Sequence, residues 1–159
     1  MKSLVLVIGE RNSGKSAIIS SLTGCKDHSF RGDVVSKADG KIIFVINSSP
    51  QEEKLTPEEF SAILDRVHNT PTIIGLVVAV RPTFPHKRLS LENIIEKAQE
   101  HHIFDIHSFL LTPPYNESDI DVENTSHRLS ALGITPHFLD ARRFAFLNAL
   151  DIKRVIGIP

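Results

Sequence analysis

The chain has 159 residues, of which 41% are hydrophobic and 23% are charged, and its formal net charge is -1. This composition suits one globular domain with its own core, and without a basic excess we expect neither nucleic acid nor an anionic membrane as a partner. Cys25 is the chain's single cysteine, which favours a reducing compartment. The apolar run at 4–8 is too short for a membrane span, which needs about 20 residues, or for a signal peptide. We therefore expect a single soluble, cytoplasmic domain over residues 1–159.

Apolar runs and helical periodicity alternate from one end of the chain to the other. In chain order the predicted elements are a strand at 4–8, a helix at 15–23, strands at 34–37 and 41–46, a helix from 57, a strand at 73–80, a helix from 91, a strand at 107–111, a helix at 121–132, a strand at 137–139 and a helix at 142–150. Such alternation predicts a mainly parallel sheet with helices on both faces, which is an α/β fold of three layers.

Local signals fix two of the element boundaries. Asp39-Gly40 lies between two β-rich segments and is typical of a tight hairpin, so the second strand is expected to be antiparallel to the third. Thr56 and Glu59 have the spacing of a capping box, with Pro57 at the first helical position, so a helix should begin there.

Phe144 and Phe146 are expected to pack in the core or along the edge of the last helix.

Residues 9–16 fit the pattern G-x-x-x-x-G-K-[ST], which binds phosphate groups. Its glycines let successive backbone N–H groups point at phosphate oxygens, and the helix that follows adds its positive dipole end. Lys15 can reach the β- and γ-phosphates, and Ser16 can ligate Mg²⁺. The segment directly follows an apolar strand and opens a helix, as this chemistry requires. The predicted nucleotide-binding residues of the loop are Gly9, Glu10, Arg11, Asn12, Ser13, Gly14, Lys15, Ser16 and Ala17.

The order of elements and the loop together resemble the Ras-like small GTPases, a family of P-loop NTPases, over nearly the whole chain. The Asp39-Gly40 hairpin followed by right-handed crossovers predicts a six-stranded sheet in the order 2-3-1-4-5-6, numbered along the chain, with only strand 2 antiparallel. The segment Asn47-Ser48-Ser49-Pro50-Gln51-Glu52-Glu53 corresponds to the family motif D-T-A-G-Q-E-E. The resemblance therefore makes Gln51, together with Lys15, a catalytic candidate, with Gln51 orienting the attacking water. Ala141, within Asp140-Ala141-Arg142, corresponds to the family's base-contacting S-A-K loop.

Several positions depart from the family pattern. Asn47 offers no carboxylate to the metal's hydration shell, and Pro50 has no N–H for the γ-phosphate. Arg11 places a bulky side chain where many members have glycine. The guanine-reading N-K-x-D motif is missing at its usual place, although Asn116 and Asp119 form an N-x-x-D pattern four residues later. The changes at Asn47, Pro50 and Arg11 predict slow hydrolysis, and those at Asn47 and Pro50 predict poor discrimination between di- and triphosphate.

Three functions remain open at this point. The first is a GTPase-like nucleoside triphosphatase that uses Mg²⁺ with GTP or ATP and hydrolyses it weakly or with the help of an unidentified protein partner. The second is a pseudo-GTPase, a binding and interaction module without catalysis. The third is a P-loop small-molecule kinase. The basic, proline-rich segment 81–88 follows the end of a strand and could approach a phosphate or a partner, although a solvated connection is the simpler interpretation.

Overall fold

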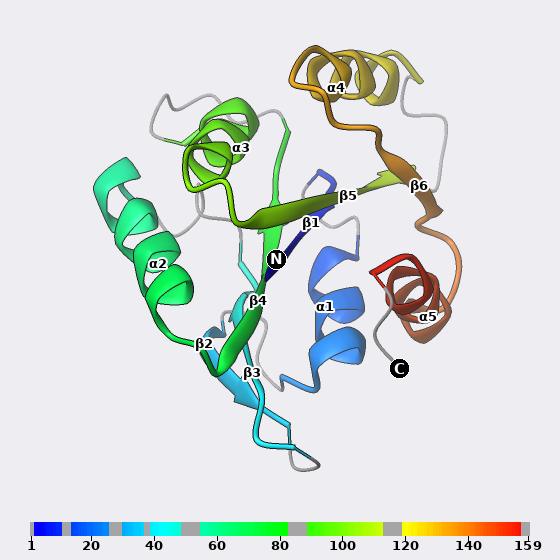
Figure 1. The fold of residues 1–159 in the computed structure, drawn as a ribbon. Helices are drawn as coiled ribbons and strands as arrows, with labels where there is room; N and C mark the ends of the chain where they lie inside the picture. Colours follow the sequence, from blue (N-terminus) through cyan, green and yellow to red (C-terminus); the bar gives the residue numbers. More distant parts are fainter. Residues whose placement is uncertain are drawn as a thin grey trace.

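Six strands form one mixed sheet in the order β2-β3-β4-β1-β5-β6 (Figure 1). The computed structural model describes residues 2–10, 14–25, 30–36, 39–48, 55–82, 89–112 and 119–156. The strands are β1 (Lys2–Ile8), β2 (Arg31–Val35), β3 (Ile42–Ile46), β4 (Ile73–Val80), β5 (Phe104–Thr112) and β6 (His137–Asp140). Strand β2 pairs antiparallel with β3, and every other pairing in the sheet is parallel.

The helices cover the sheet in two layers (Figure 1). Helices α2 (Pro57–Asn69), α3 (Leu91–Glu100) and α4 (Asp119–Ala131) share one apolar core with one face of the strands. Helices α1 (Lys15–Thr23) and α5 (Ala145–Ile156) share a second core with the opposite face. Successive residues of β1 alternate between the two cores, as Leu4 and Leu6 lie in the first and Val5 and Val7 in the second. A strand buried on both faces must be apolar throughout, which explains its continuous run.

Most predicted boundaries match the structure. The Thr56 hydroxyl accepts from the Glu59 N–H at 3.1 Å and the Glu59 carboxylate accepts from the Thr56 N–H, which completes the capping box. Gly24 ends α1 in the left-handed conformation at φ 80°. The main differences are that β2 runs from Arg31 to Val35 and not over 34–37, that β5 begins at Phe104, and that α5 begins at Ala145 and continues past the predicted residue 150. Among the described residues, no helix is both long and apolar enough to cross a bilayer.

The order of the central strands differs from the predicted one. The six strands, the two helical layers and the antiparallel β2 are confirmed, but the order 2-3-1-4-5-6 is wrong because β4, not β1, lies next to β3. In the predicted order, the connection from β3 to β4 through α2 would cross β1. In the observed order, the connection from β4 to β5 through α3 crosses it. The helices of these connections have 13 and 10 residues, so either connection is long enough to cross one strand. Seven of the eight residues of β4 are buried, which suits the centre of the sheet.

Gly75 marks the close contact between β4 and β1. It is paired with Ser3, and a Cβ atom at Gly75 would lie 2.9 Å from the Ser3 carbonyl oxygen. Because backbone cannot move aside cheaply in the middle of a sheet, Gly75→Ala should lower the free energy of unfolding by about 1–3 kcal/mol. Urea unfolding would measure this loss. Gly40→Asn, at a turn position with φ 71° and no atom near the added Cβ, should cost less. An equal loss in both variants would contradict the steric explanation.

Candidate phosphate-binding site

The predicted phosphate loop lies at the carboxyl edge of the sheet, between β1 and α1. Gly9 directly follows β1, and its N–H donates to the Val80 carbonyl of β4 at 3.0 Å. Gly14 is the N-cap of α1 and adopts φ 94° and ψ 11°, a left-handed conformation that favours glycine. The loop therefore has its strand before it and its helix after it, as predicted. Arg11, Asn12 and Ser13 lie outside the described residues.

Lys15 turns back over the loop that precedes it. Its side chain is 8% exposed, and its Nζ donates to the carbonyl oxygens of Gly9 at 2.7 Å and Glu10 at 2.9 Å. The ammonium group is thereby held at the mouth of the loop, where a phosphate oxygen could replace a carbonyl as its acceptor. This position agrees with the role that the sequence pattern gives to Lys15.

The start of α1 also suits an anion. Its first turn, Lys15 to Ile18, contains no acidic side chain, and no side-chain cap is found there among the described residues. Helix α2, in contrast, begins with a capping box and with Glu58 and Glu59 in its first turn. Free backbone N–H groups and the positive dipole end at a helix N-terminus favour a negative ligand. The start of α2 is thus capped by its own side chains, whereas the first turn of α1 carries no negative charge that would repel an anion.

Ser16 faces the end of β3. Its hydroxyl donates to the Asn47 carbonyl oxygen at 3.4 Å, a long hydrogen bond. Hydroxyl and carbonyl oxygens are the hard ligands that Mg²⁺ accepts, and this ion commonly completes its shell with water and substrate phosphates. Among the described residues, no group of three or more His, Cys, Asp or Glu side chains could hold a metal by itself. The Ser16 hydroxyl is therefore one oxygen ligand of the kind that a magnesium ion accompanying a nucleotide accepts.

The side chain of Asn47 is buried and hydrogen-bonds to residues at the end of α1 and just after it. It is 1% exposed, and its Nδ2 donates to the Ser20 hydroxyl at 3.3 Å and to the Cys25 sulfur at 3.4 Å. Ser20 lies one helical turn beyond Ser16, so the amide group points along α1 while the main-chain oxygen faces Ser16. The structure places Asn47 beside Ser16 as the resemblance implied, but it directs the side chain elsewhere.

Charged side chains connect the loop to the helices on the other face of the sheet. The Arg81 guanidinium, directly after β4, lies 4.0 Å from the Glu10 carboxylate. Arg128 on α4 donates to the Pro82 carbonyl at 2.8 Å and makes two hydrogen bonds to Glu92 on α3. These bonds from Arg128 hold the pKa of the Glu92 carboxyl below its ordinary value. The basic segment 81–88 indicated Arg81 in advance, whereas no motif indicated Arg128.

The loop after β6 is held by its own hydrogen bonds. Asp140 accepts from the Arg142 N–H at 2.9 Å and from its guanidinium, and Arg142 lowers the pKa of that carboxyl. The Ala141 N–H, expected to contact a base, donates to the Thr112 carbonyl at 3.4 Å. Asn148 on α5 donates to the Asp140 carbonyl at 3.0 Å. The structure therefore places Ala141 at the predicted strand end, with its N–H in a long bond to β5.

Other predicted positions fall outside the described residues or differ from expectation. Pro50, Gln51 and Asn116 are not among the residues that the structure describes, so the water-orienting glutamine stays a prediction. The expected packing of Phe144 and Phe146 is wrong, since they are 73% and 56% exposed. Their rings stack on each other, with centroids 6.1 Å apart.

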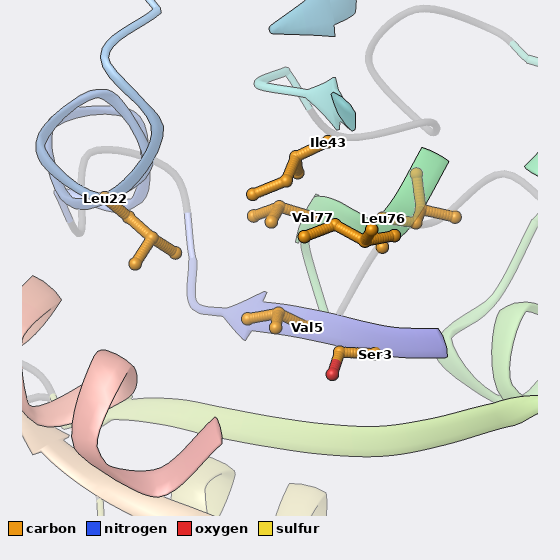
Figure 2. A pocket seen from close by; sticks show the side chains of 8 residues that line it. Ser3, Val5, Leu22, Ile43, Leu76 and Val77 are labelled. Atoms are coloured by element: carbon orange, nitrogen blue, oxygen red, sulfur yellow. The ribbon is translucent and has the colours of Figure 1, made fainter. Parts of the chain in front are cut away.

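An apolar cavity of about 110 Å³ lies elsewhere, against α1 and the amino ends of the strands (Figure 2). The residues that line it are Ser3, Val5, Leu22, Ile43, Ile74, Gly75, Leu76 and Val77. Val5 and Ser3 lie three and five residues before the end of β1, which at a rise of about 3.3 Å per residue puts these walls of the cavity roughly 10–17 Å from the start of the loop. Its walls carry no charge that would recognise a phosphate, so the two sites are separate.

Comparisons with known proteins find the fold but no sequence family. No family model matches the chain, and no curated protein matches it either. A probable GTP-binding protein EngB has a solved structure that is 17% identical, with 97% of this chain and 96% of that chain covered and a TM-score of 0.55. A de novo designed protein with the P-loop NTPase fold is 12% identical, with 99% and 94% covered and a TM-score of 0.54. The chain has the P-loop NTPase fold.

A third solved structure is the FeoB G-domain from Methanococcus jannaschii. It is 20% identical, 99% of this chain and 97% of that chain are covered, and the TM-score is 0.48. The alignments with EngB and with the designed protein each cover nearly the full length of both chains. The geometry around Lys15 therefore belongs to a complete P-loop NTPase fold and not to an isolated strand-to-helix turn.

Proposed function

We propose that this P-loop protein binds a nucleoside triphosphate together with Mg²⁺, in the manner of a GTPase, and hydrolyses it slowly on its own. The observation that carries the proposal is the position of Lys15, whose Nζ lies over the loop carbonyls beside a helix start without acidic residues. Guanine is the preferred base in this proposal because a structure that shares the fold belongs to a probable GTP-binding protein. Ser16 would ligate the metal, which would neutralise charge on the phosphates.

The alternative of a pseudo-GTPase rests on a specific observation. The buried Asn47 side chain donates to Ser20 and Cys25 and brings no carboxylate toward Ser16. A protein of this kind would bind nucleotide, or nothing, and act through a protein partner. The antiparallel β2 weighs against the third possibility, a small-molecule kinase, since P-loop kinases generally lack that hairpin.

We also propose that the chain is one cytoplasmic domain, because its single Cys25 is buried and free.

Titration of the purified protein with fluorescent GTP, GDP, ATP and ADP, each with and without Mg²⁺, tests the proposal. We expect saturable binding of the guanine nucleotides that strengthens with Mg²⁺. Single-turnover hydrolysis should be slower than about 1 s⁻¹, the lower end of ordinary enzyme turnover, because Asn47 offers no carboxylate and Pro50 no N–H. Failure of all four nucleotides to bind at millimolar concentration would end the proposal. Faster turnover by the unassisted protein would refute the slow-hydrolysis part alone.

A further inference from the structure

The charged residues of the helices are divided between the two layers. Helices α2, α3 and α4, which cover one face of the sheet, each contain three acidic residues and one basic residue. Helix α1, which packs beside α5 on the other face (Figure 1), contains no acidic residue. The stretch 140–156, which includes α5, contains four basic and two acidic residues. The net charge of -1 is therefore the sum of a negative layer and a positive layer, and it does not describe either of them.

Large apolar side chains are exposed on the positive layer. Phe144, just before α5, and Phe146, in its first turn, are both more than half exposed, and their rings stack on each other. Leu150, one turn beyond Phe146, is 43% exposed. Residues four apart lie on the same side of a helix, so Phe146 and Leu150 share the outer side of α5. Neighbouring apolar side chains that remain in water mark a surface that another body covers.

Basic side chains flank these apolar residues at both ends. Arg154 lies four residues after Leu150 with its side chain 79% exposed, and Lys153 precedes it in the last turn of α5. Arg142 and Arg143 come before the helix, with side chains 69% and 38% exposed. The three apolar side chains and these four cations together form what we call the α5 surface.

Two carboxylates lie among the four cations and do not balance their charge. Asp140 lies 3.2 Å from Arg142, and Asp151 is shared by Arg143 at 2.6 Å and Arg154 at 3.7 Å. The α5 surface therefore keeps a positive charge around its apolar residues. This charge weighs against a second copy of the chain, because a symmetric contact would bring like charges together.

We propose that the α5 surface docks this protein on an anionic lipid membrane, with its apolar side chains in the interface and its cations at the phospholipid headgroups. Protruding Phe and Leu side chains beside Lys and Arg are typical of helices that lie at a membrane surface. Long basic side chains keep their charges at the headgroups while their apolar neighbours are buried more deeply. The negative layer of α2, α3 and α4 faces away from the membrane, so charge repulsion favours the same orientation.

Flotation of the full chain with lipid vesicles, without nucleotide, tests this inference. The vesicles contain phosphatidylcholine alone or with about 30% phosphatidylserine, which gives them a negative surface potential. The protein should bind the anionic vesicles at least about tenfold more tightly than the neutral ones. The difference should shrink in about 1 M salt, which screens charges beyond about 3 Å.

Two double variants separate the apolar contribution from the charged one. Phe144→Ala with Phe146→Ala should weaken binding to the anionic vesicles at least about tenfold, because it removes both stacked rings. Lys153→Ala with Arg154→Ala should weaken it by about tenfold at low salt and have little effect at high salt. A charged pair whose loss matters equally at both salt concentrations would contradict the electrostatic part of the inference.

The matched controls remove similar side chains from other surfaces. Val35→Ala shortens a 56% exposed apolar side chain of β2. Lys41→Ala with Lys97→Ala removes two positive charges from the β2–β3 hairpin and from α3. Both controls should bind vesicles as the natural protein does. Urea unfolding of every variant shows that it is folded before its binding is compared.

Three results would overturn the inference. The first is a natural protein that binds neither kind of vesicle, or both equally well. The second is a control variant that loses as much binding as the α5 variants. The third is a protein that ignores vesicles but binds polyglutamate, or forms a dimer that Phe144→Ala with Phe146→Ala abolishes, which would assign the α5 surface to an acidic protein or to a second copy. None of these measurements depends on nucleotide, so the inference stands or falls separately from the proposed function.

Discussion

Replacing Lys15 with alanine is expected to lower the affinity for nucleotide at least tenfold, equivalent to about 1.4 kcal/mol or more. The side chain is 8% exposed, and its ammonium group lies within 2.9 Å of two loop carbonyls, so its charge acts in a poorly solvated place. The substitution removes the cation aimed at the phosphates and leaves no neighbour on α1 to replace it. Fluorescence titration with tri- and diphosphates measures the effect, and both classes should weaken.

The same substitution should also affect the empty protein. Hydrogen bonds to a charged group contribute about 1.5–3 kcal/mol, and Lys15 makes two of them to its own loop, to Gly9 and Glu10. Urea unfolding therefore accompanies the titration, so that a loss of affinity is not confused with a loss of fold. Lys41→Ala, in an exposed lysine of the β2–β3 hairpin, is the matched control and should change neither quantity. Equal nucleotide affinity in the natural protein and Lys15→Ala would remove Lys15 from the site.

The parts of the fold that depend on local sequence could be predicted. The phosphate loop needs glycine at positions 9 and 14, and Gly14 adopts the positive φ that the pattern implies. The capping box at Thr56 and the hairpin at Gly40 likewise depend on a few neighbouring residues. These features are encoded within one turn of chain, where propensity and hydrogen-bond chemistry act without help from distant segments.

The parts that depend on distant contacts could not be predicted. Strands β1, β3 and β4 are all apolar runs, so their composition does not say which of β1 and β4 lies next to β3, and only the pairing of β3 with β4 in the folded sheet decides it. The ion pair of Arg81 with Glu10 joins residues that follow two strands far apart in the sequence, β4 and β1. The bonds of Arg128 to α3 and to Pro82 join residues 36 and 46 positions apart, with no motif to indicate them.

The orientation of Asn47 is the difference with the greatest effect on function. From the sequence alone, Asn47→Asp would be expected to restore a carboxylate near the metal. In the structure this side chain is 1% exposed and donates to Ser20 and Cys25, one turn away from Ser16. A carboxylate cannot donate these bonds and would be charged in a buried place, which is costly. The Ser20 hydroxyl can turn to donate to it, so the cost is moderated.

We therefore expect Asn47→Asp to lower the free energy of unfolding at pH 7 by about 2 kcal/mol or more, without increasing the dependence of nucleotide affinity on Mg²⁺. Burial should raise the folded-state pKa of the introduced carboxyl above its unfolded value of about 3.9. The destabilisation is then full above the folded pKa and shrinks as the pH falls through it toward the unfolded value. Urea unfolding of both proteins between pH 7 and pH 4 should show the gap narrowing. Asn124→Asp, on the exposed face of α4, is the matched control and should show a small gap. A variant at position 47 that is as stable as the natural protein and binds Mg²⁺-nucleotide more tightly would mean that this side chain faces Ser16 after all.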